Sequence, residues 1–201
     1  MGCESSHSVE VTSQEKRRSV KSDQLGERQG SLDSEPGPTD VFTDIQIDCI
    51  RSTWPLVAKN RIKHGTNIFT DIFMIEPQVK QLFPFRDVNE TALMIDHGFI
   101  RHVTRYMNCL ELVCDNLETM HDPDCAATRH LLVLGATHAH VHNFDFRFFH
   151  VFIKCTHFTW EQVLGEEYTQ EVREAWTKLF DFVVTKIQEG FLVCMAKKKK
   201  V

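Results

Sequence analysis

From residue 41 to residue 192 the apolar residues of this chain recur with the spacing of an α-helix. No stretch alternates apolar and polar residues for long enough to predict a strand. Each such helix must bury its apolar stripe against a neighbouring helix. The pattern therefore predicts an all-α fold.

Turn residues and prolines divide this region into segments. Thr43 is a plausible N-cap for the first helix, and Pro55 should kink or tighten its end. Asn143 is a candidate cap for a Phe-rich helix, and Gly190 should end the last one. Further helices are expected over about 61–76, from Pro77, and over 91–118, 122–141, 144–164 and 167–192, with a loop over 84–90.

Size and composition fit one domain plus a tail. The chain has 201 residues, of which 42% are hydrophobic. Its net charge of −5 gives no general attraction to nucleic acid, so no nucleic-acid partner is expected. Residues 1–40 lack the apolar core of a secretory signal. The seven scattered cysteines are typical of a reducing compartment such as the cytosol.

The first residues, MGCESSHS, match a lipidation motif. Gly2 followed by Ser6 is typical of N-myristoylation, and Cys3 is a candidate for palmitoylation, although short motifs also occur by chance. Two acyl chains would hold a membrane stably, which predicts the cytoplasmic face of the plasma membrane, with the cytosol as the alternative. The polar composition of 4–40 indicates a disordered tether, so 1–40 is expected to be a disordered acylated tail.

The chain closes on a basic run, Lys197–Lys200, within a predicted polybasic tail over 194–201. These lysines would support membrane binding if both ends of the chain face the same anionic surface. A solvated basic terminus is an equally good interpretation.

Two histidines lie on apolar stripes. His102 follows Phe99 by three residues, and His138 follows Leu134 by four. Either one alone is more often a core histidine bonded to a carbonyl. Elsewhere, His97 and His140 should point away from the apolar faces, whereas packing is the expected role of His150 and His157.

A zinc site would need four ligands, usually with two close in sequence, and neither inward histidine has such a partner. Two imidazoles on separate helices, among Phe and Leu, fit the two axial positions of a flat apolar cofactor instead. That cofactor would be haem, whose iron is commonly held by His.

Four stretches carry a resemblance to a known family: KHGTNIFTDIFMIEPQVKQLFPF (63–85), FIRHVTRYM (99–107), VLGATHAHV (133–141) and REAWTKLFDFVV (173–184). Their order and spacing resemble the globin family, and within it the neuroglobins and the N-terminally acylated globin X group. The resemblance covers roughly 44–192 and implies a globin domain over 41–193, with helices packed around a haem pocket.

The resemblance implies roles for residues of this sequence. His138 matches the proximal iron ligand, and His102 matches the distal histidine. Tyr106 stands where globins usually have an aliphatic residue, and its phenol could hydrogen-bond a ligand or a water. The other implied haem contacts are Phe69, Phe83, Phe85, Leu134, Phe148 and Val151, with Arg105 and His142 near the propionates, while Trp176 matches the tryptophan of the final helix.

The implied cofactor is haem b, iron protoporphyrin IX. We expect a membrane-tethered, bis-histidyl, six-coordinate globin acting in electron transfer or in sensing oxygen or nitric oxide. Its expected partners are a diatomic gas (oxygen, nitric oxide or carbon monoxide) and an electron donor or acceptor. It need not be a dedicated enzyme, although chemistry of the nitrite reductase or nitric oxide dioxygenase type is compatible. The alternatives are a five-coordinate globin that binds oxygen reversibly, or a haem-free helical scaffold.

Overall fold

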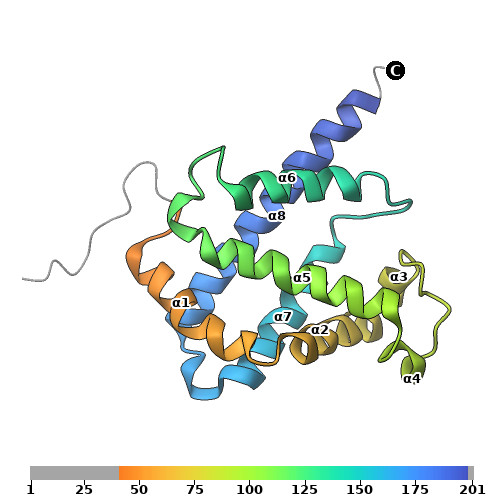
Figure 1. Cartoon of the computed structure of the whole chain (residues 1–201), viewed down its shortest axis with the longest axis horizontal. Coiled ribbons are helices and arrows are strands. Elements are labelled where there is room, and N and C mark those ends of the chain that lie inside the picture. Colours follow the sequence, from red (N-terminus) through yellow and green to blue (C-terminus); the bar gives the residue numbers. More distant parts are fainter. Residues whose placement is uncertain (1–40, 199–201) are drawn as a thin grey trace, which may run out of the picture. The chain divides into compact units, whose positions relative to one another are not determined.

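The computed structural model describes residues 41–198, and every regular element in that range is a helix (Figure 1). The expected all-α fold is thus confirmed for this range. The predicted tail over 1–40, the lipidation sites Gly2 and Cys3, and residues 199–201 lie outside the described residues. The helices are α1 Asp44–Ala58, α2 Arg61–Ile75, α3 Pro77–Lys80, α4 Glu90–Leu93, α5 His97–Asp115, η1 Leu117–Thr119, α6 Ala126–His138, α7 Phe148–Leu164, η2 Gly165–Glu167 and α8 Gln170–Lys198.

Helix α1 begins where the sequence predicted. The side chain of Thr43 accepts a hydrogen bond from the backbone N–H of Gln46 at 3.2 Å, and the Gln46 side chain accepts one from the N–H of Thr43 at 3.1 Å. This capping box satisfies two backbone donors that helix geometry leaves without partners. Pro55 lies inside the helix, which continues to Ala58.

The expected helix over 91–118 is interrupted, which is a correction. Helix α4 ends at Leu93, and α5 starts again at His97 because the carboxylate of Asp96 caps it, accepting from the N–H of Phe99 at 2.8 Å. After α5 ends at Asp115, the chain continues into the short helix η1.

The segment after α6 also differs from the prediction. Asn143 does not cap α7: its φ of 60° lies in the left-handed region, where helix N-caps do not fall, and α7 begins only at Phe148. Helix α6 is shorter than expected, spanning Ala126–His138. The residues between α6 and α7 therefore form a non-helical connection directly after His138.

The final helix passes Gly190, where it was expected to end, and continues to Lys198. Gly190 is a buried residue of α8, the helix that packs across α6 (Figure 1). A Cβ atom there would lie 2.0 Å from the carbonyl oxygen of Leu132, and one at Gly135 would lie 1.9 Å from that of Ile187. Because glycine has no side chain, the backbones of α6 and α8 can touch at these two positions. Gly190 therefore serves helix packing and does not end the helix.

Helices α2, α5 and α7 hold the aromatic cluster around Phe69. Gly65 of α2 lies against α5, since a Cβ on it would meet the side chains of Val103 at 2.8 Å and Met107 at 3.0 Å. One turn further along α2, Phe69 is buried, 5% exposed, and reaches the rings of α5 and α7.

None of the described helices is long and apolar enough to cross a membrane.

Gly190→Ala should lower the free energy of unfolding by about 2 kcal/mol. The added methyl group would overlap a backbone carbonyl that has little room to move, and this cost exceeds the gain in helix propensity from Gly to Ala. Urea unfolding followed by circular dichroism measures the change. Gln188→Ala, at an exposed position of the same helix, is the matched control and should shift stability little. Equal stability of the two variants would contradict the close crossing.

Candidate functional site

His138 is the last residue of α6, and the helix itself orients its ring. Its Nδ1–H donates to the carbonyl of Leu134, one turn earlier, at 2.8 Å. A carbonyl only accepts, so the neutral ring carries its proton on Nδ1 and keeps the lone pair on Nε2. Nε2 makes no hydrogen bond to any residue in the described range. This is the arrangement of a histidine prepared to bind a metal through Nε2.

Aromatic residues surround the His138 ring. Its centroid lies 4.8 Å from that of Phe144, in the connection after α6, and 6.1 Å from that of Phe149 on α7. Burial lowers the pKa of His138, while the hydrogen bond to Leu134 acts in the opposite direction. The imidazole is consequently held in the neutral form that a metal ligand requires.

His102, on α5, is the second inward imidazole. Its ring meets those of Phe69 and Phe83 edge-on, with centroids 4.9 Å and 4.7 Å away. Burial lowers its pKa to about 4, and the nearby charges of His138 and Arg105 lower it further in the same direction. Within residues 41–198 neither ring nitrogen of His102 has a hydrogen-bond partner. The sequence expectation that both histidines project into one apolar region agrees with this geometry.

Phe69, Phe83 and Phe85 form an aromatic wall beside His102. Phe83 and Phe85, in the loop after α3, stack with centroids 4.8 Å apart and planes 13° from parallel. Phe69 meets Phe83 edge-on at 6.4 Å. The three rings, singled out from the sequence, therefore lie together, and they keep the surroundings of the imidazole apolar.

Tyr106 lies one turn after His102 and belongs to the same aromatic cluster. Its ring meets Phe69 at 5.5 Å and Phe152 at 4.9 Å, both edge-on. Its hydroxyl lies 3.3 Å from Oγ1 of Thr156, which itself donates to the carbonyl of Phe152 at 2.9 Å. The phenol therefore donates to Thr156, and burial raises its pKa so that it stays protonated.

Helix α7 supplies the opposite side of this region. Phe148 and Val151, expected from the sequence, are half-buried against the core. Phe152 was missed, although it links the two sides by contacting Phe69 and Phe149. Residues 148, 152 and 156 share one face of a helix, a spacing that could have identified it.

A pocket of about 730 Å³ opens between the segment 78–86 and the connection after α6. His142 and Arg86 both line it. The role of His142 near a propionate stays a prediction, and Arg86 was not singled out from the sequence. Arg105, the other expected propionate contact, is exposed on α5 and is not part of this lining. The lining residues are Gln78, Gln81, Leu82, Pro84, Arg86, His140, Val141, His142, Asn143 and Phe148.

The other histidines singled out from the sequence fall into two groups. His97 and His140 are exposed, as predicted, whereas His150 is exposed and does not pack, contrary to expectation. His157 does pack: its ring lies 5.2 Å from Phe180, Nδ1 contacts the hydroxyl of Tyr168 and Nε2 contacts that of Thr177. Because both nitrogens of His157 are engaged, it is not available as a ligand.

Comparison with known proteins decides the family. The family model described as Globin matches residues 66–187. The chain belongs to the globin family. It is 28% identical to cytoglobin-2 of Oryzias latipes over 77% of this chain and 86% of that protein, and 27% identical to neuroglobin of Danio rerio over 71% and 87%. The resemblance to globins, neuroglobins included, is thereby confirmed.

A solved structure has the same fold. It is a hexacoordinated heme protein from an anhydrobiotic tardigrade, matched with a TM-score of 0.68 and 21% identity over 78% of this chain and 99% of that one. Membership of the family makes this globin a haem-binding protein of the class that binds diatomic gases such as oxygen.

The residues present fit haem. His138 and His102 present neutral imidazoles with uncommitted nitrogens, and Phe69 and Phe83 supply apolar surface beside His102. His142 and Arg86 line the pocket that opens at the connection after His138. The residues from 41 to 198 hold no cluster of three or more His, Cys, Asp or Glu side chains suited to a metal ion. Such a cluster would not be needed for haem, because the porphyrin itself would supply four of the ligands to the iron.

The low pKa of His102 predicts a pH-dependent stability of the haem-free globin. Between pH 6.5, the ordinary pKa of histidine, and about pH 4, the pKa of His102 in the folded protein, the unfolded chain binds a proton at His102 that the folded chain does not bind. Stability should therefore fall as the pH drops through this window, by about 3 kcal/mol from this residue. Urea unfolding at a series of pH values measures the slope. His102→Leu should flatten it, and an unchanged slope in that variant would contradict the burial of His102.

Proposed function

We propose that this globin holds haem b between His138 and His102 and is six-coordinate when no external ligand is bound. The observation that carries the proposal is the hydrogen bond from His138 Nδ1 to Leu134, which leaves Nε2 free, with a second neutral imidazole on the facing helix. Haem supplies an iron centre that binds small ligands and exchanges single electrons.

The two histidines have different freedom. His138 is fixed by its bond to the backbone of its own helix, which suits a permanent ligand. His102 is held only by edge-on contacts with Phe69 and Phe83, and no hydrogen bond to the described residues restrains its ring. His102 is therefore the imidazole suited to leave the iron when an external ligand arrives.

This arrangement sets how a gas competes. An external ligand would have to displace His102, which would lower its apparent affinity by the fraction of protein in which that position is already taken. The phenol of Tyr106 donates to Thr156 and so does not offer its proton to such a ligand. Once displaced, His102 is the side chain on that side able to donate a hydrogen bond.

An internal ligand and a membrane tether both favour a role other than bulk oxygen storage. Tethering through Gly2 and Cys3 would prevent carriage by diffusion, and a six-coordinate centre suits electron transfer or the sensing of oxygen or nitric oxide. The tardigrade protein of the same fold is named as hexacoordinated, which supports this coordination by analogy.

Replacing His102 by alanine should convert the unliganded ferrous protein from a low-spin six-coordinate spectrum to a high-spin five-coordinate one, because the internal ligand is gone. Absorbance spectra of the purified ferrous forms measure the change. His97→Ala, at an exposed position of the same helix, is the matched control and should retain the wild-type spectrum. A wild-type protein that is already five-coordinate would instead favour reversible oxygen binding with His102 as a donor only.

His138→Ala should abolish stable haem retention, since it removes the permanent ligand. Haem content is measured as the ratio of Soret to protein absorbance after gel filtration. The exposed His150→Ala control should retain haem fully. Normal haem content in His138→Ala would exclude this residue as the proximal ligand.

Gly2→Ala should release the globin from membranes, because N-myristoylation requires that glycine. Fractionation of cells expressing each full chain, with immunoblotting of the membrane and soluble fractions, measures the change. Cys3→Ser should weaken retention as well, since a single acyl chain binds only marginally. Retention of both variants on membranes would contradict the tether while leaving the haem site intact.

A further inference from the structure

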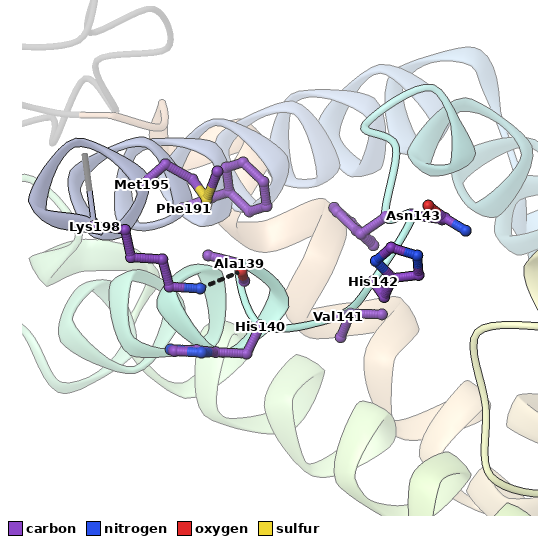
Figure 2. Close-up of a pocket in the computed structure, with 9 residues that line it drawn as sticks. Ala139, His140, Val141, His142, Asn143, Phe191, Met195 and Lys198 are labelled. Atoms are coloured by element: carbon purple, nitrogen blue, oxygen red, sulfur yellow. Dashed lines mark hydrogen bonds between the residues drawn. The ribbon is translucent and has the colours of Figure 1, made fainter.

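A second pocket, of about 400 Å³, lies between the connection after α6 and the last turns of α8. Figure 2 shows its lining side chains, with Lys198 reaching from α8 toward Ala139. It is separate from the site of His102 and His138, neither of which lines it. The lining residues are Ala139, His140, Val141, His142, Asn143, Phe144, Phe191, Met195 and Lys198.

One part of this pocket suits an anion. Lys198 Nζ donates to the carbonyl of Ala139 at 2.9 Å, and an ammonium group has three donors, so two remain for a ligand. His140 also lines the pocket, and its Nε2 lies 3.8 Å from Sγ of Cys194. No carboxylate is present among the lining residues, so nothing in the lining opposes a negative charge.

The other part is apolar. Phe144 and Phe191 pack with centroids 5.9 Å apart, and Met195 lies one turn after Phe191 on α8. Methionine adapts its shape to irregular apolar ligands. Beside the pocket on the same helix, Leu192 is 56% exposed. A cation and an apolar floor thus lie together in one open surface pocket of a size typical for small ligands.

From this we propose that the pocket binds the anionic head group of an acyl lipid, with the head at Lys198 and the first methylenes of the tail against Phe191 and Met195. The surrounding charge favours the same ligand, because Lys197 is exposed and Lys199 and Lys200 follow in the sequence. The head is a phosphate or a carboxylate, supplied by a phospholipid in a bilayer or by a free amphiphile.

The site adjoins the haem side of the globin. Residues 140–143 line both this pocket and the larger one, so an occupant touches the segment that directly follows His138. A lipid bound here would therefore contact the same backbone that borders the proximal ligand.

The test uses the haem-loaded full chain carrying Gly2→Ala and Cys3→Ser, so that acylation does not contribute. Titration calorimetry with dodecyl phosphate, below its micelle concentration, should show one site. Lys198→Glu should weaken binding at least about tenfold, since a charge-assisted hydrogen bond is lost. Lys197→Glu, the same charge change on the next residue and outside the lining, should retain binding within a few-fold. Met195→Gln should weaken binding through the tail.

The comparison of the two lysine variants decides whether Lys198 forms a specific site. Equal losses in Lys198→Glu and Lys197→Glu would mean general attraction to a basic terminus and would overturn the proposal. Absence of binding, or equal binding of inorganic phosphate and dodecyl phosphate, would also overturn it. Vesicles of phosphatidylcholine with and without phosphatidylserine then identify the source. Binding to phosphatidylserine vesicles that Lys198→Glu removes indicates a bilayer lipid, whereas binding of the free amphiphile alone indicates a soluble one.

Discussion

The close crossing of α6 and α8 is the constraint on which the proposed haem site depends. Gly135 and Gly190 let the two helix backbones touch, and this contact fixes the position of α6. His138 sits one turn after Gly135, and its ring is in turn fixed by its bond to Leu134. The direction of the His138 imidazole is therefore set by backbone contacts: the crossing positions α6, and the carbonyl of Leu134 orients the ring.

The apolar surroundings of His102 and His138 explain why both imidazoles are neutral. Each imidazole is surrounded by phenylalanine rings, and burial disfavours the charged form of each. Two neutral bases therefore occur in one apolar region without a carboxylate to stabilise either cation. Such an environment is costly for a protonated histidine and favourable for a ligand to iron, since metal binding uses the lone pair that protonation would occupy.

The helices and the two inward histidines could be predicted from the sequence, because a stripe of apolar residues marks the buried face directly. The ends of helices were predicted less well. The apolar pattern continues across Asp96, so it did not show that a new helix begins there. Glycine is a common helix terminator, but Gly190 instead allows close packing of α8 against α6. Partners across the core, such as Thr156 for Tyr106 and Phe152 for Phe69, depend on how separate helices face each other. A single sequence contains no signal for that register.

The conformation of Asn143 limits how far relatives of this globin can vary. Its backbone lies in the left-handed region at φ 60°, which asparagine, aspartate and glycine adopt at small cost and branched side chains do not. A homologue that follows the same path between its proximal histidine and its next helix should carry one of these three residues there. A valine or isoleucine at that position would mark a protein in which the connection runs a different way.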